Sequence, residues 1–446
     1  MTFSSFLKDI LFILPVLLVS CQLKTEQAEK KLYLPDSVWM VPPANDYYAD
    51  TSTYCLKHCK QSENVAIFWH KDFGDDPMSN PDSSLRFNVD ELSAESERIY
   101  QYYINDLKFV EKGHSITDRY KALIFIFSGD DGTAYGGGED DNVGVFWAPP
   151  VRMNKAPFGA LAHELGHSFQ YLLKADGCST FTAGFSIYEM TSQYMLWQVY
   201  PEWMTFENYH LIDFMKQTHY AFLHEINMYH SPYVLEYWSM LHGLDFIGRL
   251  WREAQEGEDA VMTYKRITGI DQEKFNDEIF DAARRFVTWD MDRIEEVAKP
   301  YQNQHSCKLD AIGDGWYAID TTRCLQNYGY NAIQLKVPEA GTTVKLLFNG
   351  IEGSKGYRTV QVEKAGWRYG FVAYKSDGRR EYGSVCSTIT GETTFNVPQN
   401  TEYLWLVVSG APTEHWIHEI DWKDENDEQW PYKIKLMGTA LDESVI

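Results

Sequence analysis

A short segment with two histidines constrains the fold of this chain most. Residues 160–170 have the sequence ALAHELGHSFQ, which contains the pattern His-Glu-x-x-His. Pro157 suits the first turn of a helix, and Asp176-Gly177 suits its end. Residues four apart lie on one helical face, so His163 and His167 can bind the same metal ion. The sequence therefore predicts a helix with a zinc site on one face.

The residue after the first histidine gives this predicted site its chemistry. Glu164 would lie beside the zinc, where it can take a proton from a water whose pKa the metal lowers to about 7. This spacing is typical of a metalloprotease helix. The alternative is a helix with two buried, hydrogen-bonded histidines and an incidental glutamate. On the same helix, Gly166 would let a neighbouring element approach closely.

Two histidines need a third protein ligand, which leaves one position of the zinc tetrahedron open for water. The chain is expected to be mostly helical from residue 188 to about 298, and Glu189 lies in the first of these helices, with twenty-one residues between it and His167. Its neighbours are apolar, and a metal would remove the cost of burying an unpaired carboxylate there. The alternative is a salt-bridged surface glutamate. The rival ligands are Asp176, Glu202 and Glu207.

The N-terminus predicts export. Residues 11–19, LFILPVLLV, form an apolar run too short to span a bilayer comfortably, as in a secretory signal peptide. Leu18-Val19-Ser20-Cys21 also resembles a bacterial lipobox, which implies a signal peptide over residues 1–21 and lipidation of Cys21. The alternative is an ordinary signal peptide with an incidental cysteine. We therefore expect an extracytoplasmic protein, lipid-anchored in the bacterial cell envelope, with the membrane leaflet left open.

Length and charge bound the remaining possibilities. A chain of 446 residues exceeds one typical core, so we expect a tether and irregular lead-in over 22–60, a catalytic domain over 61–303 and a third domain over 304–446. The net charge of −24 argues against nucleic acid as a partner.

The cysteines outside the signal peptide are compatible with disulfides. Beyond the cytoplasm they could form up to three bonds, and Cys307 with Cys324 is a reasonable pair. Cys55 and Cys59 have no matching Cys or His pair nearby, which argues against a second zinc site there. The six cysteines are Cys55, Cys59, Cys178, Cys307, Cys324 and Cys386.

The elements before the motif suggest a resemblance. Strands are expected over 65–69, 122–127 and 143–147, and a helix over 89–109. Between the last two strands, the acidic, glycine-rich segment 129–141 could bind calcium, but Asp and Gly also favour turns, and we expect a turn. This order of elements resembles the N-terminal half of zincin metallopeptidases.

The resemblance implies further site residues. In zincins the strand before the active-site helix is an edge strand that binds extended peptide, which here implies that Val143, Gly144 and Val145 align the substrate. In the glutamate zincins, the thermolysin-like clan, the third ligand is a Glu on the next helix, as Glu189 would be. No third His follows at the metzincin spacing. Thermolysin-like enzymes stabilise the oxyanion with a His or Tyr from a later helix. The candidates are His219, His224, Tyr229 and His230, of which we choose His230.

The last third of the chain changes character. After a long core helix that begins at Asp271, short strands and turns from about residue 305 predict a β-sandwich or jelly roll. Exposed aromatic side chains of this domain could bind glycans, although tryptophans within strands more often pack in the core. The candidate tryptophans are Trp316, Trp367, Trp405, Trp416, Trp422 and Trp430.

Together these features predict an α+β zincin-like catalytic domain with a mainly helical second half, followed by an all-β sandwich. The chain resembles an uncharacterised family of bacterial surface lipoproteins, distantly similar to mucin- and glycoprotein-directed glutamate zincins. The resemblance implies a lipid-anchored zinc endopeptidase that acts on extracellular proteins or glycoproteins. One alternative is a non-catalytic surface lipoprotein that binds glycan or protein, although Glu164 argues against it. Another is zinc-dependent hydrolysis of a non-peptide bond.

Overall fold

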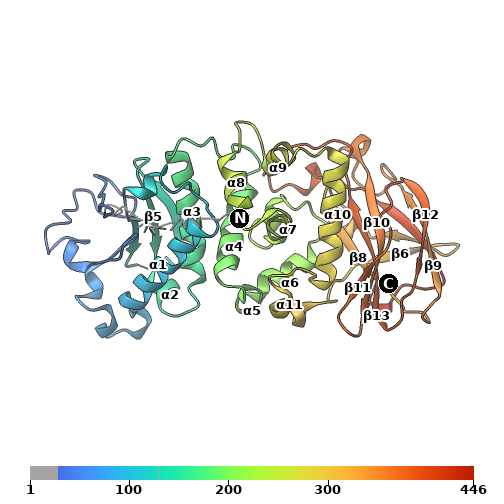
Figure 1. The fold of residues 1–446 in the computed structure, drawn as a ribbon, viewed down its shortest axis with the longest axis horizontal. Helices are drawn as coiled ribbons and strands as arrows, with labels where there is room; N and C mark the ends of the chain where they lie inside the picture. The colour runs from blue at the N-terminus through green and yellow to red at the C-terminus, as the bar shows by residue number, and fades with distance from the viewer. Residues whose placement is uncertain (1–28, 130, 446) are drawn as a thin grey trace, which may run out of the picture.

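The computed structural model describes residues 29–129 and 131–445, so the predicted signal peptide and Cys21 lie outside the described residues. Along its long axis the molecule has three regions (Figure 1): a small sheet with helices at one end, a bundle of helices in the middle and a β-sandwich at the other end. The predicted fold class is confirmed. None of the described helices is long and apolar enough to cross a membrane.

The N-terminal sheet has five strands in the order β1-β2-β3-β5-β4. Its central strands are parallel, and both β1 and β4 are antiparallel to their neighbours. The strands are β1 (Cys59–Gln61), β2 (Val65–Trp69), β3 (Ala122–Ile126), β4 (Tyr135–Glu139) and β5 (Val143–Ala148). β2, β3 and β5 are buried throughout, which explains their nearly continuous apolar sequences. Helices α1 (Val89–Asn105), α2 (Pro150–Met153) and α3 (Gly159–Ala175) complete this region.

The prediction for the edge strand is wrong. Val143, Gly144 and Val145 belong to β5, which lies between β3 and β4 and is fully buried. A strand with neighbours on both sides has no free backbone edge to offer a peptide. The edge strand is β4, which forms within the glycine-rich segment that we expected to be a turn. The carboxylate of Glu139, at the end of β4, accepts a hydrogen bond of 3.1 Å from the backbone of Trp39.

The middle region contains eight helices among the described residues. They are α4 (Ser186–Val199), α5 (Trp203–Phe206), α6 (Asn208–Lys216), α7 (Tyr233–His242), α8 (Phe246–Arg252), α9 (Ala260–Thr268), α10 (Gln272–Thr288) and α11 (Glu295–Ala298). As the sequence suggested, Asp271 caps α10 by accepting a hydrogen bond of 2.8 Å from the backbone N–H of Lys274.

The C-terminal region is a sandwich of two antiparallel sheets, ordered β11-β10-β13-β8 and β12-β9-β14-β7-β6. The strands are β6 (Leu309–Gly313), β7 (Trp316–Ile319), β8 (Tyr330–Leu335), β9 (Thr343–Gly350), β10 (Trp367–Lys375), β11 (Arg380–Tyr382), β12 (Thr390–Asn396), β13 (Thr401–Gly410) and β14 (Tyr432–Met437). Phe286 of α10 and Trp405 and Val407 of β13 belong to one buried cluster. The helical region and the sandwich therefore share a core.

The structure bears on two expectations about single side chains. Cys307 and Cys324 are free thiols buried in the sandwich core, so the predicted disulfide is wrong; they pack there as small apolar side chains. All six described cysteines are free. Among the candidate tryptophans, Trp367, Trp405 and Trp430 are fully buried, whereas Trp422 is 66% exposed.

Candidate metal centre

Close contact between α3 and α4 brings the predicted ligands together. A Cβ atom on Gly166 would lie 3.0 Å from Oγ and 3.2 Å from Cα of Ser192, so glycine at this position lets the two helices approach without crowding. This bears out the expectation for Gly166. The approach places the first turn of α4, which carries Glu189, over the histidine face of α3.

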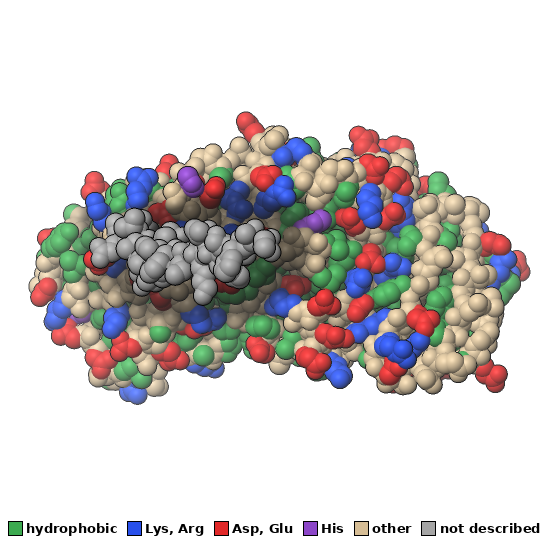
Figure 2. Space-filling model, viewed as in Figure 1, with side chains coloured by type: hydrophobic (Ala, Val, Ile, Leu, Met, Phe, Trp, Pro, Cys, Tyr) green, Lys and Arg blue, Asp and Glu red, His purple; other side chains and the backbone are tan. Residues whose placement is uncertain are grey.

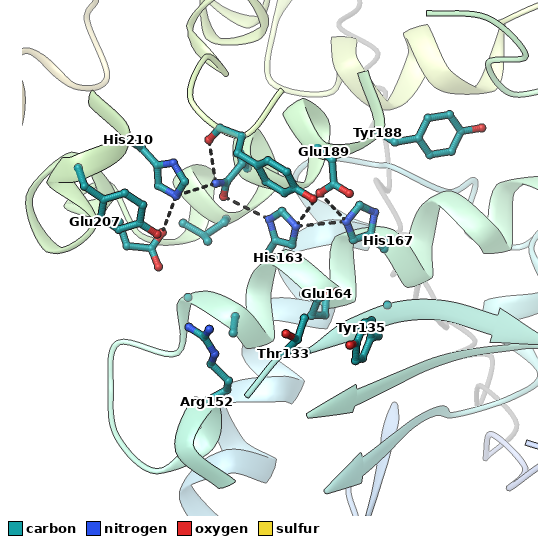
Figure 3. Close-up of a pocket in the computed structure, with 18 residues that line it drawn as sticks. Thr133, Tyr135, Arg152, His163, Glu164, His167, Tyr188, Glu189, Glu207 and His210 are labelled. Carbon is teal, nitrogen blue, oxygen red and sulfur yellow. Dashed lines mark hydrogen bonds and ion pairs between the residues drawn. The ribbon is translucent and has the colours of Figure 1, made fainter. Parts of the chain in front are cut away.

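Three ligand atoms converge between these helices (Figure 3). The Nε2 atoms of His163 and His167 lie 3.2 Å apart, and each lies 3.1 Å from Oε2 of Glu189. Ligands on a tetrahedral zinc ion with bonds of about 2.0–2.1 Å are themselves about 3.3 Å apart. The spacing of the three atoms therefore fits one zinc ion.

The hydrogen bond on the far side of His167 sets its tautomer. The side-chain amide N–H of Gln170 donates to the backbone carbonyl of Tyr188 over 2.8 Å and to Ser192 Oγ over 3.1 Å. The amide oxygen of Gln170 must then face His167 Nδ1, 3.0 Å away. Because an amide oxygen only accepts, Nδ1 carries the proton and Nε2 presents a lone pair.

His163 is oriented in the same way by a second glutamine. The amide N–H of Gln193 donates to the backbone carbonyl of Tyr229 over 2.9 Å, so its oxygen faces His163 Nδ1 at 3.2 Å. Nε2 of His163 is therefore also a lone-pair donor to metal. Protein groups that fix a ligating ring through its other nitrogen are typical of metal sites.

The charge of the site also favours a cation. Neither Nε2 atom carries a proton in this arrangement, so neither imidazole can donate a hydrogen bond to Oε2 of Glu189. Two lone pairs and a carboxylate oxygen that face one another within 3.2 Å repel unless a positive charge lies among them. The residues present thus fit a zinc ion.

Glu164 lies next to the ligands on the side of the cavity that faces Thr133 and Tyr135 (Figure 3). Its carboxylate and the nitrogens of His163 and His167 all lie within 4.8 Å of one another. Burial raises the pKa of the Glu164 carboxyl, which makes its carboxylate a stronger proton acceptor. Its position beside the ligands meets the geometric requirement for a general base.

These residues line a cavity of about 550 Å³. One wall is the start of β4, with Tyr135 and Gly136, and the opposite wall comes from the helical region, with Glu207, Tyr209 and His210. The cavity could accommodate an extended segment of polypeptide along β4.

Over the part of the surface that the structure describes, acidic and basic side chains are interspersed on the face shown in Figure 2.

The structure places Tyr229, and not the predicted His230, at the cavity. The Tyr229 ring stacks on His163 with ring centroids 6.2 Å apart. Burial and the neighbouring Glu189 raise the pKa of the Tyr229 hydroxyl, so it remains a hydrogen-bond donor. His230 instead pairs with His210, with their Nδ1 atoms 2.8 Å apart, and is not among the residues that line the cavity.

The other candidates from the sequence have different environments. Asp176 accepts a hydrogen bond of 2.7 Å from the backbone of Ile116 and lies at another cavity, and Glu202 is exposed. Glu207 lines the metal cavity but accepts a hydrogen bond of 2.6 Å from Trp203 Nε1. His219 and His224 do not line the cavity.

The site combines the His-Glu-x-x-His pattern with a set of donor atoms that could hold a metal ion. A family model matches residues 24–443, and the chain belongs to this family, DUF6055, whose description is a family of unknown function. No curated protein matches the chain. Among solved structures, the M60 catalytic domain of Clostridium perfringens ZmpC, in complex with the sialyl T antigen, is 12% identical with a TM-score of 0.34, over 83% of this chain and 70% of that chain.

A second likeness concerns the sandwich. The C-terminal family 22 carbohydrate-binding module of Clostridium thermocellum Xyn10B is 12% identical with a TM-score of 0.19, over 31% of this chain and 83% of that chain. A xylan-binding domain of the same module family has the same identity and TM-score, over 31% of this chain and 84% of that chain. Neither likeness is close enough to assign a function.

Proposed function

We propose that this protein is a zinc-dependent endopeptidase that hydrolyses peptide bonds of extracellular proteins or glycoproteins. The observation that carries this proposal is the arrangement of His163, His167 and Glu189, whose lone pairs converge at the spacing of zinc ligands. A structural zinc site would need no base, but here Glu164 lies beside the ligands in a cavity open to substrate.

The edge strand explains the choice of a peptide as substrate. In the described sheet β4 pairs only with β5, so its outer backbone edge is free to bind an extended chain by β-augmentation. Gly136 of β4 lies directly against the motif helix, where a Cβ atom would be 2.7 Å from His167 Cβ. A peptide paired with this strand would run past the histidines within reach of the general base.

The chain's own groups divide the chemistry between them. When bound, zinc supplies a Lewis acid that polarises the scissile carbonyl and acidifies a water molecule. Glu164 takes the proton of the attacking water and later gives it to the leaving nitrogen. The Tyr229 hydroxyl donates a hydrogen bond to the carbonyl oxygen as negative charge develops there. Gln170 and Gln193 hold both imidazoles with Nε2 toward the metal.

The setting of this activity is also part of the proposal. Lipidation at Cys21 would tether the enzyme to the membrane, with the catalytic region outside the cytoplasm. A glycosylated substrate would contact the sandwich, where Trp422 is the candidate tryptophan with an exposed ring. Glycans stack on such rings.

Replacement of Glu164 tests the function directly. The full chain would be incubated with mucin and with a non-glycosylated protein, and cleavage and zinc content would be measured for wild type and Glu164→Gln. We expect cleavage to fall by about 10²- to 10⁴-fold in the variant while zinc is retained. Glu202→Gln, the same chemical change at an exposed carboxylate away from the cavity, should keep full activity.

Two results would overturn the proposal. Equal cleavage by wild type and Glu164→Gln would mean that this carboxylate is not the base. A zinc-loaded wild type that cleaves neither protein would favour the binding lipoprotein or hydrolysis of a non-peptide bond.

A further inference from the structure

A second group of side chains that could hold a metal ion lies where the helical region meets the sandwich. His224 and Glu225 lie at the start of the short 3-10 helix Glu225–Asn227, and His418 lies in the loop between β13 and β14. One ligand atom from each of the three lies within 4.8 Å of the others. The proposed enzyme does not use these residues, and none of them lines its cavity.

The hydrogen bonds of His224 fix its tautomer. Its Nδ1 accepts a hydrogen bond of 3.1 Å from the backbone N–H of Ile226, so the ring proton is on Nε2. Nε2 then donates to Oδ2 of Asp427 over 3.0 Å. Nδ1 lies 3.5 Å from Oε2 of Glu225, which is also an acceptor. In many metal sites a carboxylate accepts a hydrogen bond from the ring nitrogen of histidine that does not bind the metal, and so orients the ring.

Glu225 and His418 complete the group. Oε2 of Glu225 lies 2.6 Å from Nε2 of His418, and Oε1 accepts a hydrogen bond of 2.8 Å from the backbone N–H of Trp422. The carboxylate is therefore held with Oε2 between the two imidazoles. His418 is 13% exposed at its side chain, so the group lies close to the surface.

The charge of this region requires compensation. The carboxylates of Glu225, Asp427 and Glu428 are all buried, with 3%, 6% and 4% of each residue exposed. Glu428 accepts a hydrogen bond from the backbone of Asn327, and the Arg358 guanidinium donates to the backbone carbonyl of Asp427 rather than to a carboxylate. Among the described residues, the side chains that pair with the Glu225 and Asp427 carboxylates are His224 and His418. Buried carboxylates are stabilised by paired positive charge or by metal ions.

We propose that His224 Nδ1, Glu225 Oε2 and His418 Nε2 bind a second zinc ion, which fastens the β13–β14 loop to the helical region. Two nitrogens and one carboxylate oxygen are a donor set that zinc accepts, with a water as fourth ligand. Binding would exchange two hydrogen bonds for metal bonds, the one from Ile226 to His224 Nδ1 and the one between His418 Nε2 and Glu225 Oε2, and the Nε2 proton of His418 would move to Nδ1 or to solvent. Asp427 keeps the His224 ring in position. This ion would have a structural role, because its ligands come from the helical region and from the β13–β14 loop and none of them lines the cavity of the proposed active site.

The same loop offers a matched control. His415 also joins the loop to the helical region: its Nε2 lies 2.8 Å from Oδ2 of Asp259 and its Nδ1 lies 3.0 Å from the Tyr328 hydroxyl. It lies outside the metal-binding group. His415→Gln therefore removes a comparable interaction between the two regions without removing a metal ligand.

The test is the zinc content of the full chain after dialysis against zinc and then against metal-free buffer. We expect two zinc ions per wild-type chain, one in His163→Ala, one in His418→Gln and none in the double variant. His415→Gln should keep two. A chelator should lower the midpoint of thermal unfolding of His163→Ala, which keeps only the second ion, and should not lower that of the double variant.

The two sites can fail separately. If His418→Gln binds as much zinc as wild type, the second site does not exist, whatever the first one does. If His163→Ala binds as much zinc as wild type, the proposed active site fails and the second site is untouched. If His418→Gln misfolds, a second measurement tests the site: Co²⁺ is added in place of zinc to the His163→Ala chain, and its visible absorption is recorded. The intense absorption of four-coordinate Co²⁺ would support the second site, and the absence of this absorption would overturn it. If hydrogen bonds alone hold these three side chains together, the chain will show no such absorption.

Discussion

The amide oxygen of Gln193 lies 3.2 Å from Nδ1 of His163, on the side of the ring away from the ligand atoms. The amide N–H of Gln193 donates to the backbone carbonyl of Tyr229, whose ring stacks on His163. One side chain thus positions a proposed zinc ligand and the proposed oxyanion donor together. Gln193 lies one helical turn after Glu189 on α4, so the ligand and its support share a helical face.

Gln193→Met should lower zinc affinity by about 10- to 100-fold, because the His163 ring loses the acceptor that fixes its tautomer. The dissociation constant would be measured by competition with a chromophoric chelator. Gln193→Glu keeps an acceptor at the same place and should bind zinc at least as tightly as wild type. Unchanged affinity in Gln193→Met would show that the ring is held by packing alone.

Gly136→Ala should destabilise the site, because the new Cβ would lie 2.7 Å from His167 Cβ and closer still to the backbone oxygen of Glu164. We expect a loss of about 1–3 kcal/mol in the free energy of unfolding, measured with urea, and a lower zinc affinity. Gly137→Ala is the control, since its Cβ would meet nothing within 4 Å. Equal effects of the two substitutions would contradict the close contact between β4 and α3.

Tyr229→Phe should lower kcat by about 10²- to 10³-fold with little change in KM, as expected when one donor to a developing oxyanion is removed. The ring remains, so its packing on His163 is preserved. His230→Gln should change kcat far less, because His230 does not itself line the cavity and reaches it only through its contact with His210. A larger loss in the His230 variant would restore the prediction made from the sequence.

Acid should destabilise the fold through three buried histidines. Burial lowers the pKa of His210, His219 and His305 to about 3 in the folded state, against an ordinary value of 6.5. Below pH 6.5 the unfolded chain binds protons that the folded chain does not, so stability is lost as pH falls toward 3. Each histidine contributes at most about 1.4 kcal/mol per pH unit.

The acid effect can be measured by urea unfolding of chelator-treated protein between pH 7.5 and 5, so that zinc release does not contribute. His219→Gln cannot take up the proton and should reduce the slope of unfolding free energy against pH. The slope would stay the same if His219 were already protonated in the folded state.

The catalytic motif could be predicted from the sequence because its geometry is local. His163, Glu164 and His167 lie within one helical turn, so their relative positions follow from helix geometry alone. Glu189 lies on a different helix, yet the cost of burying a carboxylate among apolar neighbours pointed to it. The structure brings it to 3.1 Å from both histidines.

Features that depend on tertiary contacts could not be predicted in this way. β4 has three consecutive glycines, which disfavour strands, and it forms because β5 pairs with it and α3 packs against it. Tyr229 and His230 are adjacent, and no periodicity in the loop shows which one faces the metal. Gln170 could have been found, since it follows His167 by three residues on the same helical face.

The glycines of β4 also determine where an enzyme of this kind could recognise its substrate. An incoming chain meets only backbone groups at Gly136, Gly137 and Gly138. Hydrogen bonds to these groups depend on the direction and extended conformation of the peptide, and not on the identity of its side chains. Discrimination is then left to the opposite wall, where α6 contributes Tyr209 and His210. Evolution could redirect such an enzyme to new targets by changing that wall while the strand and the motif helix stay as they are.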